Sequence, residues 1–101
     1  MASRWLNCRR IGPTMSHMDV EAEASLLLQA LLRVQALPGE TREEMLEDQS
    51  GGETWLAIRC CLSDASDDGF DLPADLLQRA RDIFPDLGEY VDAVVAAGRA
   101  A

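Results

Sequence analysis

The sequence predicts an all-α fold: a compact bundle of about five short helices with a flexible N-terminal tail. Leu and Ala dominate the composition and β-branched residues are scarce, which favours helices over strands. From residue 19 onward, apolar residues recur in steps of three, four and seven, which is the period of an amphipathic helix. Pro and Gly interrupt these stretches at short intervals, so brief loops should join the helices into a bundle.

The first helix is expected between Asp19 and Leu37. Asp19 can cap its N-terminus, and two acids in its first turn suit the positive end of the helix dipole. Pro38-Gly39 should end it, because proline and glycine interrupt a helix at this position.

A second, acidic helix is expected through about Gln49. Thr41 and Glu44 have the spacing of a capping box, which predicts its start. Its apolar face is thin, because only Met45 and Leu46 are apolar. A Gly-Gly pair follows and ends it.

The third helix should begin near Glu53 or Thr54. It is apolar nearly all round, which is typical of a helix in the centre of a fold, so Trp55 is expected in the core. Residues 64–71 should then form an acidic loop.

Two further helices complete the expected bundle. Leu72-Pro73 opens the fourth, which ends at Pro85. Asp86 and Glu89 have capping-box spacing and predict a fifth helix, which ends at Gly98. Apolar residues line its inner face: Leu87, Tyr90, Val91, Val94 and Val95. Without an internal repeat or a linker, residues 19–101 should form a single helical domain.

Residues 1–18 differ from the rest in charge and periodicity. They contain three arginines and no acid, and they lack the apolar core of a secretory signal. We expect a disordered tail, dispensable for folding, or a misassigned start, with the true first residue at Met1, Met15 or Met18. No apolar run approaches the roughly 18 residues that a transmembrane helix needs, so no membrane partner is expected.

The charge of the chain indicates the kind of partner it binds. The net charge is −9, and residues 1–18 contribute +3, which leaves −12 on residues 19–101. Such a body should repel nucleic acid, because phosphate binding requires Lys and Arg. It should attract basic surfaces and raise the rate of association with them. Solubility alone is the simpler explanation of the same acids.

Residues able to support catalysis are scarce, so we expect no enzyme, no cofactor and no metal. His17 is the single histidine, the chain has no lysine, and no serine or threonine has a nearby base. The three cysteines, Cys8, Cys60 and Cys61, lack the spacing of a metal site. Cys60 and Cys61 lie in an apolar stretch, and reduced thiols fit a cytoplasmic protein.

One stretch has the spacing of an EF-hand calcium loop. Its acids and glycine match the loop pattern: Asp64, Ser66, Asp68, Gly69 and Asp75. However, Asp71 stands where an apolar residue is usual, Pro73 lies inside the loop, and Asp75 replaces the bidentate Glu. A calcium-binding module is therefore the least favoured of the three functions considered.

The middle of the chain carries a short pattern of residues. It consists of Gly52-Glu53, Leu56-Ala57, Leu62-Ser63-Asp64, an acidic turn and Phe70-x-Leu72. Over about residues 24–98 the chain resembles the MafI-like family of small bacterial immunity proteins. The resemblance implies a small acidic helical protein that neutralises a secreted toxin encoded nearby. A purely structural explanation also exists, with Gly52 as a helix stop and the leucines as core.

The favoured function is that of an immunity or antitoxin-like protein, which binds a basic toxin domain through an acidic helical surface. A toxin that cuts nucleic acid presents a basic cleft, and an acidic helix can occupy it as a phosphate mimic. The expected partner-binding residues form two acidic regions: Glu40, Glu43, Glu44, Glu47 and Asp48, and then Asp64, Asp67, Asp68 and Asp71. The alternative is a non-enzymatic helical adaptor or a subunit of a protein complex.

Overall fold

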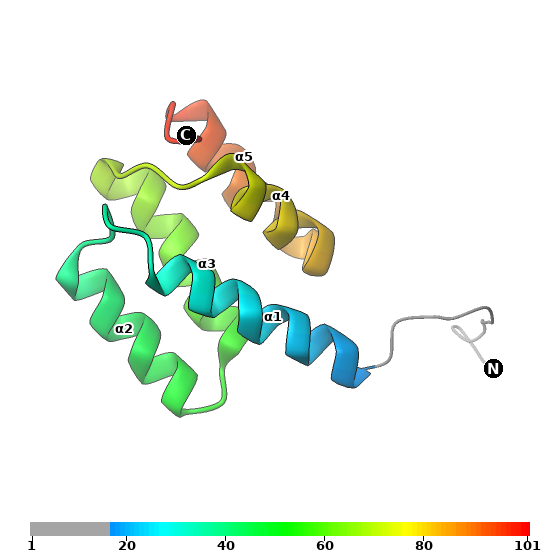
Figure 1. Cartoon of the computed structure of the whole chain (residues 1–101). Helices are drawn as coiled ribbons and strands as arrows, with labels where there is room; N and C mark the ends of the chain where they lie inside the picture. The colour runs from blue at the N-terminus through cyan, green and yellow to red at the C-terminus, as the bar shows by residue number, and fades with distance from the viewer. Residues whose placement is uncertain (1–16) are drawn as a thin grey trace.

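The computed structural model describes the backbone of residues 17–101 and the side chains from Val20 onward. This part of the chain contains five α-helices and two short helical turns (Figure 1). The elements are α1 (His17–Leu32), α2 (Gly39–Ser50), α3 (Thr54–Asp64), a π-helical turn η1 (Ala65–Gly69), α4 (Ala74–Ile83), a 3₁₀ turn η2 (Pro85–Leu87) and α5 (Gly88–Ala96). The all-α prediction is confirmed. The predicted tail lies outside the described residues except for His17 and Met18, whose backbone belongs to α1.

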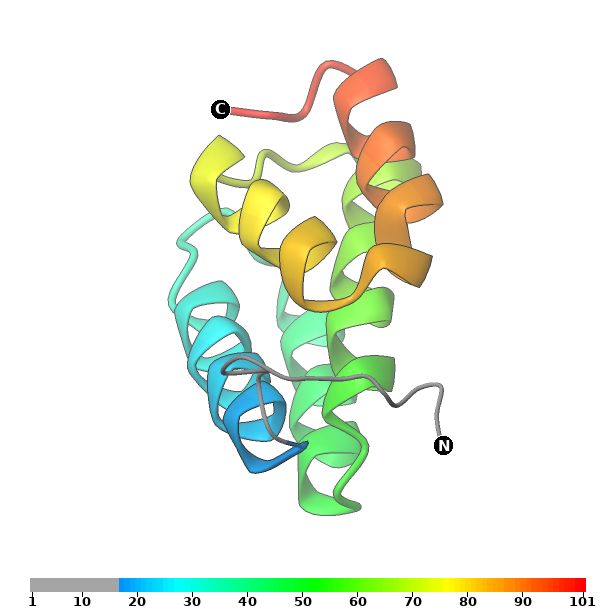
Figure 2. The same cartoon turned by 90° about the vertical axis from the view of Figure 1, so that its right-hand side faces the viewer.

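The central helix is α3, as its all-round apolar sequence predicts. It packs against α1, α2 and α5, and α4 packs against α1 and α5. In Figure 1, α2 and α5 lie on opposite sides of α3, and Figure 2 shows the same bundle from the side. Leucines of α1, α3, α4 and the segments between helices form much of the core, with Met45 of α2 and with Ile58 and Cys61 of α3 fully buried among them. Trp55, expected in this core, is only half-buried and packs against its edge.

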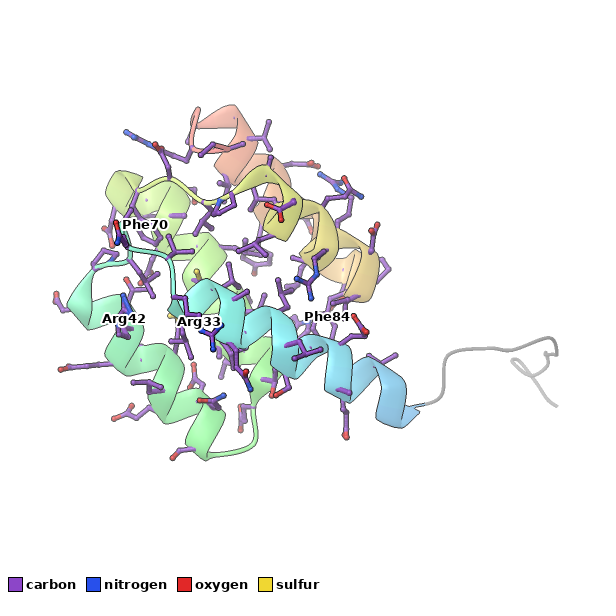
Figure 3. The ribbon with its side chains drawn as sticks, in the orientation of Figure 1. Arg33, Arg42, Phe70 and Phe84 are labelled. Carbon is purple, nitrogen blue, oxygen red and sulfur yellow. The ribbon has the colours of Figure 1, made fainter. Side chains whose placement is uncertain are left out.

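The ends of α1 differ from the prediction. The helix includes Asp19, which therefore does not act as its cap, and it ends at Leu32 instead of Leu37. The Arg42 guanidinium on α2 donates hydrogen bonds to the carbonyl oxygens of Leu32 and Val34, at 2.6 and 3.3 Å. Figure 3 shows Arg42 at this end of α1. A side chain eight to ten residues further along the chain thus satisfies carbonyl groups that a helix end leaves without partners.

Both predicted capping boxes are wrong. Pro38 precedes the first residue of α2, and Thr41 lies inside this helix, where its buried hydroxyl donates a hydrogen bond to Asp64. No side chain caps α5, because η2 occupies the segment where Asp86 was expected to act as the cap. Two residues expected on inner faces, Leu46 and Val95, are exposed.

The expected loop at residues 64–71 is mostly helical. Asp64 ends α3, and η1 continues the helical course to Gly69, whose φ of +79° suits a residue without a side chain. A Cβ atom on Gly69 would lie 3.1 Å from Arg99 Nη2, so this turn and the C-terminal segment approach closely. Leu72 pairs with that segment through two backbone hydrogen bonds. Its N–H donates to the carbonyl of Arg99, and its carbonyl accepts from the N–H of Ala101. This pairing of sequence-distant segments was not predicted.

Of the helices described, none is both long and apolar enough to cross a membrane.

Candidate functional site: an acidic helix face and the pocket beside it

Four of the predicted binding residues lie on one side of α2. Glu40, Glu43, Glu44 and Glu47 follow the spacing i, i+3, i+4 and i+7, which aligns side chains along a helix. All four are exposed, and together they line a shallow depression of about 300 Å³. We call these four residues the α2 face.

A second depression, of about 440 Å³, lies between α2 and α3 next to the α2 face. Its acids are Glu44 and Asp48 from α2 and Asp64 from α3. The remaining residues come from α3 and α5: Leu56, Arg59, Cys60, Ser63 and Tyr90. We call it the inter-helix pocket. Asp64, predicted as part of a separate acidic region, therefore joins the first region.

Antiparallel packing of α2 against α3 explains how these acids meet. At one end of the pair, Thr41 Oγ1 donates to Asp64 Oδ2 at 2.8 Å. At the other end, the Glu53 N–H donates to the carbonyl of Asp48 at 2.8 Å. One turn of each helix separates the Thr41–Asp64 contact from Glu44 and Cys60, whose side chains approach each other across the pair.

The remaining predicted acids lie beyond Asp64. Asp67 and Asp68 are exposed on η1, which continues α3 past the start of α2. Asp71 forms an ion pair with Arg99, with 3.4 Å between Oδ1 and Nη1. Among the described residues, the other ion pair joins Arg81 and Asp92. Within this part of the chain, the α2 face thus has no cation bound to it.

Sequence reasoning missed a cationic feature at the edge of the inter-helix pocket. The Arg59 guanidinium lies 5.4 Å from the ring centre of Trp55 and 5.9 Å from that of Tyr90. Both distances are within the range of a cation–π contact. The i, i+4 spacing of Trp55 and Arg59 on α3 was visible in the sequence, but nothing in it placed Tyr90 of α5 beside them.

Among the described residues, three groups that could hold a metal ion lie close together around Cys60. The Cys60 thiol lies 3.5 Å from Glu44 Oε1 and 3.9 Å from Asp64 Oδ2, and the three possible ligand atoms lie within 4.8 Å of one another. Burial, followed by the negative charge of Asp64 and the hydrogen bond and charge of Glu44, raises the pKa of this thiol to about 12. The thiol is therefore protonated at neutral pH, and it is neither a ready ligand nor a ready nucleophile.

Cys61 is an unreactive core residue. Its side chain is fully buried, and burial, followed by repulsion from the ionised form of Cys60 and by the charge of Asp64, raises its pKa to about 12. It behaves as a small apolar side chain, in line with the interpretation of its sequence context.

No protein-family model matches the chain, and no curated protein or solved structure is significantly similar to it. The resemblance to MafI-like immunity proteins therefore stays a prediction from the sequence pattern.

Proposed function

We propose that this protein is a non-enzymatic binding protein whose α2 face and adjoining inter-helix pocket bind a basic protein partner. The observation that carries the proposal is the alignment of four exposed glutamates on one face of one helix, without a bound cation in the described part of the chain. The short pattern in the middle of the sequence favours a toxin domain as this partner, neutralised inside the bacterium that makes it.

The spacing of the glutamates has an energetic consequence. Like charges at i, i+3 and i, i+4 on a helix destabilise it by about 0.2–0.5 kcal/mol for each pair. The α2 face contains such pairs from Glu40–Glu43 to Glu44–Glu47, so the isolated protein bears a repulsion that a basic partner would relieve. Acids that serve solubility alone would cost less if they were spread over several faces.

The inter-helix pocket extends the same surface with a mixed composition. Its acids border on Arg59 and Tyr90, and Arg, Tyr and Trp are the residue types that contribute most to protein interfaces. Arg59 is also held by the rings of Trp55 and Tyr90, so less side-chain entropy is lost when a partner contacts it. Acids that attract a basic partner thus lie beside Arg59 and Tyr90, which can make close contacts with it.

The experiment begins with a pull-down from the native host, followed by surface-plasmon kinetics on the purified partner. The test variant carries Glu43→Lys, Glu44→Lys and Glu47→Lys. Its association rate should fall at least about tenfold at low salt, because complementary charge steers the encounter. Raising the salt concentration should reduce the difference, because screening shortens the reach of the charges to about 8–10 Å.

A matched control separates a local effect from one of net charge. The variant Asp75→Lys, Asp82→Lys and Asp86→Lys changes the charge by the same amount at exposed positions on α4 and η2. It should keep most of the association rate of the unaltered protein. If both variants lose the same rate, or neither does, the α2 face is not the binding surface. A partner that is neither basic nor inactivated on binding would favour the adaptor function instead.

A further inference from the structure

An apolar groove of about 510 Å³ lies between α1 and α3, next to the inter-helix pocket. Val20 and Ala24 of α1, Trp55 and Leu56 of α3, and Phe84 after α4 provide its apolar lining. Figure 3 shows Phe84 beside α1. A water-facing groove with two aromatic side chains is a feature that marks binding sites on protein surfaces.

The rim of this groove is acidic. Glu21 of α1 and Glu53, just before α3, both line it and both are exposed. Within the described part of the chain neither forms an ion pair. Any apolar group entering the groove therefore passes two negative charges, which favours an apolar side chain with Lys or Arg beside it.

The groove is continuous with the proposed binding surface. Leu56 lines both the groove and the inter-helix pocket, and Trp55 contributes to the groove while its ring also contacts Arg59. A single segment of a partner could thus reach from the groove across Leu56 to the acids Glu44 and Asp48.

We infer that the groove seats the apolar side of a basic amphipathic segment of the partner protein, whose cationic side contacts Glu21, Glu53 and the inter-helix pocket. This inference rests on the proposed function and adds the kind of segment that is recognised. The charges select basic partners and set the encounter rate, and the groove adds the contact area that slows dissociation.

The probe is a synthetic amphipathic helix of leucine and lysine, added to the full chain carrying Trp5→Phe. In this background Trp55, which lines the groove, is the single tryptophan. Binding should shift the Trp55 emission to shorter wavelength and saturate. A peptide of the same composition with its leucines scattered round the helix should bind at least tenfold more weakly, because it cannot present an apolar side.

Two substitutions on α1 make a matched pair. Val20→Asn puts a polar group in the groove, whereas Leu26→Asn changes a residue that is 54% exposed on the same helix and does not line it. Val20→Asn should weaken peptide binding at least tenfold and Leu26→Asn less than twofold. Circular dichroism should show the same helix content in both. Equal effects of the two variants would overturn the inference.

The same peptide distinguishes failure of the inference from failure of the proposed function. If reversal of Glu43, Glu44 and Glu47 abolishes peptide binding and Val20→Asn has no effect, the acidic surface remains the proposed binding surface and the inference about the groove is wrong. If only Val20→Asn abolishes peptide binding, the α2 face is not the binding surface, and the groove and the acids do not form one shared surface.

Two other occupants of the groove would also overturn the inference. Tighter peptide binding by a Trp5→Ser chain than by the Trp5→Phe chain would identify the N-terminal segment of the chain itself as the occupant. A dimer in sedimentation experiments that dissociates on Val20→Asn would identify a second copy.

Discussion

Two acidic stretches that look alike in the sequence have different surroundings in the fold. In Glu40–Asp48 the glutamates share one exposed face of α2, without an ion pair in the described residues. In Asp64–Asp71 the first acid accepts a hydrogen bond from Thr41 and the last pairs with Arg99. The comparison shows that residues distant in the sequence decide which acids have a partner within the fold, Thr41 for Asp64 and Arg99 for Asp71.

The largest expected effect concerns the packing of α2, which carries the first acidic stretch, against the core. Met45 is 0% exposed between α2 and the core, whereas its neighbour Leu46 is 46% exposed. Met45→Ala should lower the free energy of unfolding by about 2–4 kcal/mol, because it removes buried methylene groups and leaves a cavity. Leu46→Ala should change it by less than about 0.5 kcal/mol. Urea denaturation of both variants measures the difference, and similar values would mean that α2 is not anchored through Met45.

A smaller effect is expected at the point where the two stretches meet. Thr41→Val removes the buried hydroxyl that donates to Asp64 and nearly keeps the side-chain volume, so it should lower the free energy of unfolding by about 1–2 kcal/mol. A double-mutant cycle with Asp64→Asn should give a coupling energy above about 0.5 kcal/mol. The cycle of Thr41→Val with Asp67→Asn is the control and should be additive. Additivity in both cycles would contradict the role given to Thr41.

The helices could be predicted because their apolar pattern is local. Their ends and the contacts between them could not, because these depend on residues distant in the sequence. Leu27, Leu28 and Leu31 fall on one side of α1 by spacing alone, and they are buried as expected. Thr41 matched a capping box in sequence, but its hydroxyl is directed to α3, because packing of α2 on α3 brings Asp64 within reach. Likewise, nothing near Leu32 indicates that α1 ends there, since Arg42 of the next helix provides the donors.

The candidate site was likewise predicted only in its local part. The sequence predicted an acidic second helix, and helical spacing places four of its glutamates along one side. The pocket was not, because it requires the position of α5 relative to α3: Tyr90 and Arg59 are 31 positions apart in the chain and lie 5.9 Å apart in the fold. Trp55, predicted to lie in the core, lines the apolar groove instead.

The smallest expected effect is the absence of a specific calcium site in Asp64–Asp75. An EF-hand requires an extended loop whose side chains and carbonyls turn inward around the ion. Here the backbone from Ala65 to Gly69 is helical, Asp64 accepts the Thr41 hydroxyl, and Asp71 pairs with Arg99. Binding calcium would require these contacts to break and the π-helical turn to unwind. Titration calorimetry at physiological salt should therefore show only weak, non-saturating heat from exposed acids. Saturable micromolar binding that Asp64→Ala abolishes and Glu47→Ala leaves intact would contradict this prediction, and it would make the second acidic stretch the functional one of the two.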